Sequence, residues 1–506
     1  MMDNSMNSTS TLYGYPIPEG VPVLKDFRVR VRIPNQEWVE LGTYRAKIDM
    51  HDVREASVAY FDFCGQVECE VTALRESVRS VEIRPRSSSV DFTREGDVIR
   101  FFLDRPAMLS VEINGDRFHN LHLFAENPLK AEKEDKNGEQ NGEQNGDQNE
   151  VCSCEGGGQN SGIIVVEPGE NELDLESILE KAARTGGRRV VRLQPGLHRL
   201  KENRCSLPSD ATVIICGGAV VMGSFLVYNK NNITITGRGM IYLGHVKKET
   251  YLRGADISSS ENIVLEGVTI MNPAHYSVHL GNSRNVQIRN IKAFSCEGWS
   301  DGIDMMACQN ILIENVFLRN SDDCIAIYGG RFKYPGNTRN VTVRGAVLWA
   351  DVAHPTMIGV HGDADKGGSI IENISFEEID ILEHHEPQDD YLGCMTINAG
   401  DDNTVRNISY RNIRVEQFER GKLLDIQVKW NKKYNDVPGK QIENIMFENV
   451  DYSGSGEHTS EIRGLDEDRR VKGVRIRNLT VRGVHVQKPE DGNLHIGEYA
   501  DDITFE

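Results

Sequence analysis

The chain has 506 residues, of which 39% are hydrophobic and 26% are charged, so it holds enough apolar residues for a sizeable core. Its formal net charge of −20 argues against nucleic acid or an anionic membrane as the partner, because both bind basic patches. No apolar run is long enough for a transmembrane helix. The first residues lack the basic and apolar regions of a signal peptide, which predicts a cytoplasmic location, or secretion if the native N-terminus lies further upstream.

Residues 24–129 follow the two-residue period of β-strands. Runs such as FRVRVRI, SVAYFDF, VECEVTAL and MLSVEI are separated by Gly, Asn, Asp and Pro, which predicts a β-sandwich domain. Residues 1–23 are then an N-terminal extension. Residues 130–162 contain three Asn-Gly-acid-Gln units and almost no apolar residue, so this segment is predicted to be a disordered linker.

The second domain is predicted to begin at residue 163 and to continue to residue 506. Residues 173–184 (LDLESILEKAAR) have the period of an amphipathic helix, and two glycines follow shortly after. From Asn232 onward, units such as NITITGRGMIYL and NILIENVFLRN recur every 23 to 37 residues. Repeats of this length, with short strands and no amphipathic helix of their own, predict a parallel β-helix. The helix at 173–184 is then its cap.

The repeats begin with an asparagine at a fixed position. These leading residues are Asn232, Asn262, Asn285, Asn310, Asn340, Asn373, Asn407 and Asn444. Asparagine tolerates the left-handed backbone conformation, so we expect each of them to lie in a turn.

Two adjacent repeats depart from the pattern by carrying carboxylates. One contains WSDGID around Asp301, and the next contains SDDCIA with Asp322 and Asp323. A spacing of about one coil predicts that the carboxylates lie near ~5 Å apart on one face. Crowded carboxylates repel one another, so at least one should hold a proton, and a protonated acid beside an ionised base can cleave a glycosidic bond. A lone Asp pair that caps a turn is the alternative, but a histidine in the third repeat, His354, favours catalysis.

These motifs resemble those of a known family. The series Ser-Asp-Gly-Ile-Asp, Asp-Asp-Cys-Ile-Ala-Ile and His-Pro-Thr-Met-Ile-Gly, which begins at His354, resembles the signature of glycoside hydrolase family 28, the polygalacturonases. The resemblance covers roughly residues 163–485. A sandwich joined to a β-helix is also similar to family 49, the dextranases and isopullulanases. The resemblance implies an all-β chain with a right-handed, pectin-lyase-like β-helix, and an inverting glycoside hydrolase.

The same resemblance implies a role for each matching residue. Asp322 matches the general acid, and Asp301 and Asp323 match the carboxylates that hold and activate the attacking water. His354 matches the histidine that supports the acid or its substrate contact. Inverting enzymes usually separate acid and base by ~6.5–9.5 Å to admit that water.

One departure from family 28 concerns the substrate. Its Arg-Ile-Lys motif, which holds a galacturonate carboxylate, aligns with Thr396, Ile397 and Asn398, and neither Thr396 nor Asn398 can neutralise a uronate. The sequence therefore predicts a neutral substrate, an α-glucan or dextran-like poly- or oligosaccharide. A polygalacturonase-type pectin hydrolase is the alternative, if a cation such as Lys366 or Lys429 enters the site from another coil.

Other side chains near these coils are candidate substrate contacts, either as sugar platforms or as polar groups on long insertions. They are Tyr276, His279, Trp299, His361, Asp363, Tyr391, Thr396, Asn398, Lys429 and Trp430. The adjacent His384, His385 and Glu386 lack the helical spacing of metal ligands, so no metal or other cofactor is expected.

Two other classes of function remain open at this point. A lyase or glycosyl-transferring enzyme can use the same scaffold, but a lyase needs a cation near a uronate, and Thr396 and Asn398 argue against one. A non-catalytic glycan-binding β-helix would be expected to have lost one of the three aspartates, and all three are present. The insertions after Asn340, Asn373 and Asn407 favour attack at chain ends or on short oligosaccharides.

Overall fold

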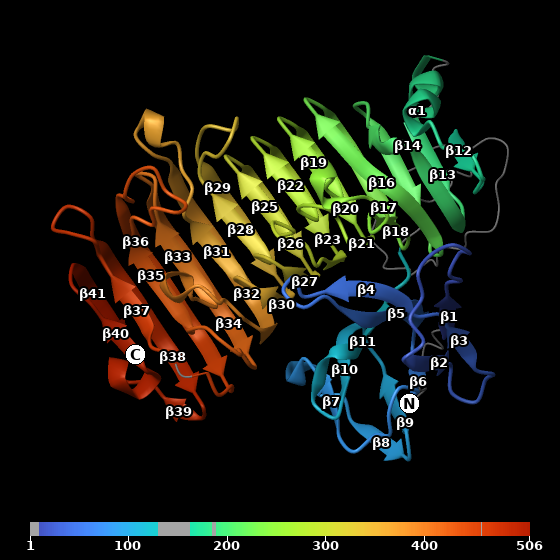
Figure 1. The fold of residues 1–506 in the computed structure, drawn as a ribbon, viewed down its shortest axis with the longest axis horizontal. Helices are drawn as coiled ribbons and strands as arrows, with labels where there is room; N and C mark the ends of the chain where they lie inside the picture. Colours follow the sequence, from blue (N-terminus) through green and yellow to red (C-terminus); the bar gives the residue numbers. More distant parts are fainter. Residues whose placement is uncertain (1–9, 130–161, 185–188, 457) are drawn as a thin grey trace, which may run out of the picture.

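The computed structural model describes residues 10–129, 162–184, 189–456 and 458–506, which form a β-sandwich and a right-handed parallel β-helix (Figure 1). The predicted fold class is therefore confirmed. The predicted linker, residues 130–162, lies almost wholly outside the described residues. Within the described part of the chain, no helix is long and apolar enough to cross a membrane.

The sandwich consists of a six-stranded and a five-stranded sheet. The six strands of the first sheet are β1 (Thr11–Gly14), β4 (Tyr44–Ile48), β5 (Arg54–Cys64), β7 (Val81–Arg84), β10 (Ala107–Ile113) and β11 (Asp116–Glu126). The second sheet contains β2 (Phe27–Arg32), β3 (Val39–Leu41), β6 (Val67–Ala73), β8 (Phe92–Glu95) and β9 (Val98–Leu103). Alternate residues such as Val29, Val31, Phe61 and Phe63 are buried between the sheets, as the two-residue period predicts. The strand β1 lies in the segment predicted as an extension and pairs with β5.

The β-helix is a single sheet of 30 strands wound into three faces. The first face contains β16 (Ala219–Tyr228), β19 (Ala255–Ser258), β22 (Val278–Gly281), β25 (Ile303–Met306), β28 (Ile325–Tyr328), β31 (Thr356–Gly359), β33 (Met395–Ala399), β35 (Leu424–Val428), β37 (Ser460–Arg463) and β40 (Leu494–Ile496). The second contains β12 (Ile163–Val166), β13 (Arg189–Leu193), β15 (Ala211–Ile215), β17 (Asn231–Gly237), β20 (Glu261–Glu266), β23 (Arg284–Arg289), β26 (Gln309–Glu314), β29 (Thr338–Arg344), β32 (Ile370–Glu383), β34 (Thr404–Val415), β36 (Gln441–Tyr452), β38 (Val471–Val481) and β41 (Ala500–Phe505). The third contains β14 (Gly196–Ser206), β18 (Met240–Tyr242), β21 (Thr269–Met271), β24 (Lys292–Phe294), β27 (Phe317–Ser321) and β30 (Val347–Val352). From β32 onward, the second halves of the long strands continue this face. The short strand β39 (Val484–His485) pairs with the end of β38. Short 3₁₀ turns lie at Arg86–Ser88, Lys248–Thr250, Ala364–Lys366, Asp389–Tyr391 and Pro489–Gly492.

Stacking of equivalent residues in successive coils stabilises the solenoid. Leu265, Ile288, Ile313 and Val343 occupy one register position, and all four are fully buried. The leading asparagines lie outside this core. All eight have φ between 54° and 59°, and neighbouring amides donate to one another over 3.0–3.3 Å, from Asn262 onto Asn232 through to Asn444 onto Asn407. The repeat-leading asparagine therefore marks a left-handed bend and a hydrogen-bonded ladder.

The helix α1 (Leu175–Arg184) covers the first end of the solenoid (Figure 1). Its buried Leu175 and Leu179 join the core of the β-helix. Asp174 accepts a hydrogen bond from the Ser177 N–H over 3.1 Å, which satisfies one free donor of the first turn. The helix begins two residues later than the sequence pattern predicts.

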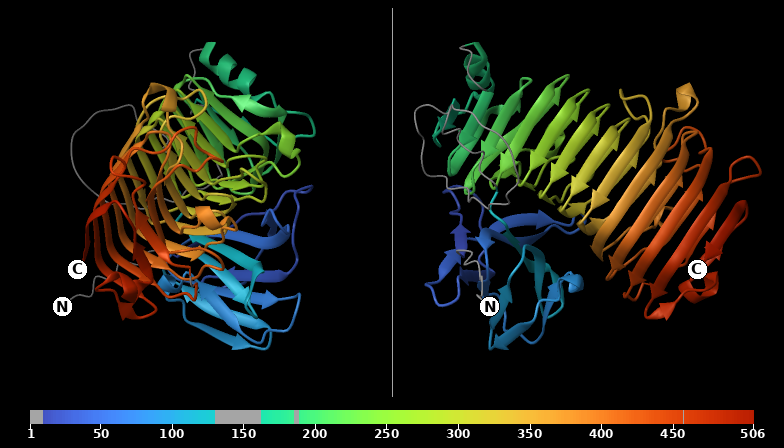
Figure 2. Two further views of the ribbon diagram at one scale, coloured as in Figure 1. Left: turned by 60° about the vertical axis from the view of Figure 1, so that its left-hand side comes forward. Right: turned by 180° about the vertical axis from the view of Figure 1, so that it is seen from behind.

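The sandwich packs against the third face of the β-helix (Figure 2). Buried Tyr44 and Ile48 of β4 and Phe124 of β11 belong to one apolar cluster with Phe317 and Trp349 of the solenoid. This contact fixes the sandwich beside the coils that carry the aspartate motifs.

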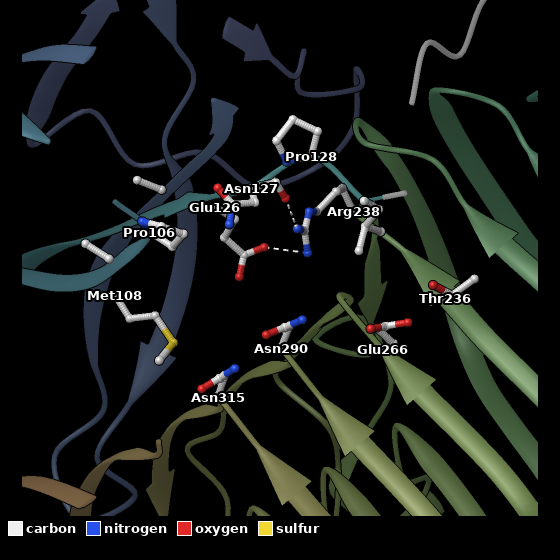
Figure 3. Close-up of a pocket in the computed structure, with 13 residues that line it drawn as sticks. Pro106, Met108, Glu126, Asn127, Pro128, Thr236, Arg238, Glu266, Asn290 and Asn315 are labelled. Atoms are coloured by element: carbon white, nitrogen blue, oxygen red, sulfur yellow. Dashed lines mark hydrogen bonds and ion pairs between the residues drawn. The ribbon is translucent and has the colours of Figure 1, made fainter. Parts of the chain in front are cut away.

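Buried charges also join the two parts. Arg238, beside β17, binds Asp62 over 3.0 Å. It also binds Glu126 over 2.5 Å and the carbonyl of Asn127 over 2.6 Å (Figure 3). Arg319 of β27 is fully buried and donates to Asp351 and to sandwich residues that include Asn120, over 2.9 Å. Because removing one partner of such a network leaves a buried charge, loss of Arg238 or Arg319 should strongly destabilise the contact between the two parts.

Candidate active site

The predicted catalytic residues lie just before strands of the first face. Asp301 lies two residues before β25, Asp323 two residues before β28, and His354 two residues before β31. The Gly302 N–H donates to the Asp323 carbonyl over 2.8 Å, and the Cys324 N–H donates to the His354 carbonyl over 2.8 Å. The three positions therefore stack in neighbouring coils, as their spacing predicts.

The aspartates converge on one cavity of about 380 Å³. Asp301, Asp322 and Asp323 line it, and one carboxylate oxygen of each lies within 4.8 Å of those of the others. Aromatic side chains line the same cavity, namely Tyr276, Trp299, Tyr328, Tyr391 and Tyr434. Aromatic rings suit the apolar faces of a sugar ring.

The carboxylate spacing is closer than the ~6.5–9.5 Å usual between the two groups of an inverting enzyme. Two oxygens up to 4.8 Å apart can instead accept hydrogen bonds from one water, at about 2.8 Å from each. The same cluster, Asp301, Asp322 and Asp323, has the oxygen ligands and the spacing to hold a divalent cation. It can therefore position either a water or a metal ion.

Asp322 has the titration expected of a general acid. Its burial, and then the charge of Asp323, raise its pKa to about 7. The N–H groups of Trp299 and Asp323 donate to its two carboxylate oxygens over 3.0 and 3.1 Å, and they oppose this rise in pKa. Burial and the neighbouring carboxylates also raise the pKa of Asp301 well above its usual value. Protons therefore remain in this cluster near neutral pH, where an acid is needed.

His354 lies behind Asp323 and is fully buried. Its Nδ1 is 2.6 Å from Asp323 Oδ1, its own N–H donates to the same oxygen over 3.0 Å, and its Nε2 is 2.6 Å from the Tyr391 carbonyl. Burial lowers the pKa of His354, but the charge of Asp323 and this hydrogen bond outweigh burial and raise the pKa to about 9. The imidazolium therefore pairs with Asp323 and orients it.

Sequence reasoning missed a fourth carboxyl group, Asp304. It is fully buried, and burial raises its pKa to about 8. Neither of its carboxylate oxygens has a hydrogen-bond partner among the described residues, and its charge helps to raise the pKa of Asp301. Strand alternation was an available signal, because Ile303 and Met305 of β25 belong to the core and Asp304 between them faces outward.

Sequence reasoning also missed residues that reach the cavity from outside the repeats. Arg331 lines it from the insertion after β28, and Lys433 lines it from the insertion after β35. Met50 and His51 line it from the sandwich. The repeat pattern does not determine the path of an insertion or the position of another domain. The sequence therefore showed that Arg331 is a cation but not that it reaches the cavity.

Four of the predicted substrate contacts line the cavity: Tyr276, Trp299, His361 and Tyr391. Trp299 is 57% exposed, with its backbone in the left-handed region at φ 61°. The Tyr391 ring stands edge-on to the His354 ring, with the centroids 4.6 Å apart. These four residues can contact a bound sugar.

Three predicted contacts lie elsewhere in the described part of the chain. His279 is fully buried, and its Nδ1 is 2.8 Å from Asp256 Oδ1. Asp363 pairs with Lys366 over 3.4 Å, and Trp430 is 48% exposed. None of the three lines the cavity that holds the three aspartates.

The remaining predicted contacts, Thr396, Asn398 and Lys429, gather around another carboxylate, Asp425. The Asn398 amide and the Lys429 ammonium each donate to Asp425 Oδ2 over 2.9 Å, and Thr396 pairs in register with Asp425. Lys422 donates to the other oxygen over 2.9 Å. Thr396 and Asn398 are buried, and within the described residues none of these side chains lines the catalytic cavity.

Comparison with known proteins agrees with this architecture. The model of the family "Glycosyl hydrolases family 28" matches residues 211–493, more than half of the chain and all of the aspartate motifs. The chain belongs to glycosyl hydrolase family 28. The resemblance seen in the motifs is thereby confirmed.

Curated proteins similar to this chain are named as polygalacturonases. The chain is 25% identical over 234 residues to "Probable exopolygalacturonase B" of Neosartorya fischeri, which covers 44% of the chain and 49% of that protein. It is 26% identical over 205 residues to "Probable endopolygalacturonase D" of the same organism, which covers 40% of the chain and 37% of that protein. The chain thus spans about half or less of the length of these relatives.

Solved structures show the same fold as this family 28 chain. Dex49A from Penicillium minioluteum superposes with a TM-score of 0.66 at 14% identity, covering 98% of this chain and 96% of that one. The family 28 exopolygalacturonase of Yersinia enterocolitica gives a TM-score of 0.54 at 12% identity, covering 91% and 98%. The first of these likenesses fits the expected similarity to family 49 in domain architecture.

Proposed function

We propose that this family 28 chain hydrolyses α-glycosidic bonds of a neutral, α-glucan-like glycan with inversion at the anomeric carbon. The observation that carries the proposal is the convergence of Asp301, Asp322 and Asp323 on one aromatic-lined cavity, with the pKa of Asp322 near 7. This arrangement supplies an acid that still holds its proton and carboxylates that can accept one.

In the proposed mechanism, Asp322 donates its proton to the glycosidic oxygen as the bond to the anomeric carbon breaks. A water held between Asp301 and Asp323 attacks that carbon from the opposite face and gives up a proton to these carboxylates. The charged His354 keeps Asp323 in place through Nδ1. The carboxylate that took the proton from water then releases it, and Asp322 regains one from solvent, which restores the enzyme.

The charge distribution around the cavity supports a neutral sugar. Among the cations of the β33 and β35 coils, Lys422 and Lys429 are both paired with Asp425. Lys433, which lines the cavity, donates to the Gln388 side chain over 2.5 Å. Arg331 does line the cavity, but its guanidinium already donates to the Tyr276 hydroxyl over 3.3 Å and lies 5.0 Å from the centroid of the Tyr328 ring. A uronate would add a further negative charge to this acidic cluster at a cost of several kcal/mol if left unpaired.

A uronide is the second candidate substrate, and Arg331 is the observation that favours it. This guanidinium is largely buried, donates to the Tyr276 hydroxyl over 3.3 Å and has no carboxylate within ion-pair distance among the described residues. A planar guanidinium with free donors is suited to a carboxylate.

Turnover on dextran, pullulan, isomalto-oligosaccharides and oligogalacturonides distinguishes the two candidates. We expect the highest kcat/KM on a neutral glycan, and a less than tenfold loss there for Arg331→Gln. If the parent cleaves oligogalacturonides efficiently and Arg331→Gln abolishes this activity, the substrate is a uronide and the proposal of a neutral substrate is wrong. If no glycan in the panel is cleaved, the hydrolase proposal itself fails.

A further inference from the structure

We propose that the β-sandwich completes the substrate site, with the hairpin between β4 and β5 placing Met50 and His51 as sugar contacts in the wall of the catalytic cavity. This sandwich hairpin, residues 49–53, connects Ile48 of β4 to Arg54 of β5. The inference rests on the proposed glycosidase function, and it gives the sandwich a role in substrate specificity.

The sandwich hairpin contacts the segments that hold the general acid. The Met50 N–H donates to Ser321 Oγ over 3.1 Å, and Ser321 directly precedes Asp322. A Cβ added to Gly298 would lie 3.7 Å from Met50 Sδ, so the thioether lies over the segment that leads into Trp299. Met50 and His51 therefore border the cavity beside Asp322 and Trp299.

The sandwich hairpin is held rigidly. Asp49 has a left-handed backbone with φ 59°, and its Oδ1 accepts the His51 N–H over 3.0 Å. Its other carboxylate oxygen forms an ion pair with Arg54, whose guanidinium lies 3.3 Å from the centroid of the Phe118 ring. A contact residue fixed in advance loses little conformational entropy when a ligand binds.

The base of the sandwich hairpin is equally fixed. Ile48 is fully buried against the β-helix, and the Lys47 N–H donates to the Asn272 side chain of the solenoid over 3.1 Å. Figure 1 shows β4 and β5 extending from the sandwich toward β27 and β30. The position of His51 relative to Asp322 is thus set by the packing of the sandwich against the solenoid.

The chemistry of the two side chains fits a neutral sugar. The imidazole of His51 is exposed and can donate to or accept from a sugar hydroxyl, while the Met50 thioether offers an apolar contact. His51 also borders a second cavity of about 270 Å³, which adjoins the catalytic one. A substrate chain that extends from the cleaved bond toward this second cavity would pass His51.

The experiment compares His51→Ala, Met50→Ala and His51→Asn with Val53→Ala in the full-length protein. Val53 is a matched control, because it lies in the same hairpin, is 54% exposed and does not line either cavity. The probe is the oligosaccharide series with the highest kcat/KM in the substrate panel, from two to six sugar units. Binding of the same probe is measured by calorimetry in an Asp322→Asn background, where turnover is blocked.

We expect His51→Ala to raise KM and the dissociation constant about fivefold, as the loss of one hydrogen bond predicts, with kcat changed less than twofold. His51→Asn should recover most of the affinity, and Val53→Ala should match the parent. The KM effect should appear only above the chain length that reaches His51. If His51→Ala and Val53→Ala have equal KM and equal affinity, the sandwich hairpin has no role in binding. The hydrolase proposal would still stand if Asp322→Asn is inactive. Failure of the parent enzyme to cleave any glycan would instead overturn the proposed function.

Discussion

Asp322→Asn is expected to remove activity and, at alkaline pH, to stabilise the protein. The raised pKa of Asp322 means that the folded state keeps a proton that the unfolded chain loses. Below about pH 4 the carboxyl is protonated in both states. Between about pH 4 and 7 the parent protein therefore loses stability as the pH rises. Above pH 7 the loss of stability caused by the ionised Asp322 carboxylate is complete.

The magnitude follows from the pKa. A shift from 3.8 to about 7 spans about three pH units, and at about 1.4 kcal/mol per unit it corresponds to about 4 kcal/mol. Because Asp322 is partly open to solvent, we expect about 2 kcal/mol. The amide can accept only one of the two N–H donors, from Trp299 and Asp323, which costs about 1 kcal/mol at every pH. The variant should then be about 1 kcal/mol less stable than the parent at pH 4 and about 1 kcal/mol more stable at pH 8.

The assay is urea unfolding of parent and variant at pH 4 and pH 8, with turnover measured in parallel. Asp52→Asn is the matched control, because the Asp52 side chain is 80% exposed. The control should follow the parent at both pH values, while Asp322→Asn should lose at least a hundredfold in kcat. A stability difference between Asp322→Asn and the parent that does not change with pH would refute the reasoning.

His354→Gln should lower kcat at least tenfold, since Asp323 loses the charged partner that orients it, whereas His384→Gln, at the buried neighbour, should change kcat less than twofold. The stabilisation by His354 is present below its ordinary pKa of about 6.5 and is lost as the pH rises through about 9, so unfolding of the two proteins should differ most at acid pH. Arg319→Met should lower the free energy of unfolding by about 3–5 kcal/mol, because Asp351 remains buried without its partner, and Asp351→Leu in the same chain should recover part of that loss in a urea titration. NMR of the first product formed should show an inverted anomeric centre; retention would indicate a covalent intermediate. Activity should survive EDTA, and a loss that Ca²⁺ or Mg²⁺ reverses would show that the aspartates hold a metal ion.

The sequence predicted those parts of the site that the repeat controls. The solenoid register fixes which residues of successive coils lie side by side, so the positions of Asp301, Asp322, Asp323 and His354 could be inferred from spacing and motif alone. The left-handed turns of the leading asparagines follow from the same register. Asp304 was within reach of this reasoning through strand alternation.

The parts that failed depend on long-range packing. Thr396 and Asn398 align with a cationic motif, but in the folded chain they are buried, and Asn398 bonds Asp425 instead of facing the cavity. Arg331 lies on an insertion whose path the repeat does not determine. His51 lies some 250 residues earlier in the sequence, and only the packing of one domain on another brings it to Asp301.

The buried charges connect the solenoid repeat with the packing of the sandwich. The solenoid stacks Asp301, Asp322 and Asp323 at spacings where their carboxylates repel, which costs stability near neutral pH. The sandwich is attached to the coil that carries Asp322 by apolar packing and by the hydrogen bonds of Arg319, so these contacts hold that coil in place. We therefore expect weakening of the Arg319 network to reduce activity before it unfolds the protein, because the hairpin that carries His51 and the coil that carries Asp322 depend on the same interface.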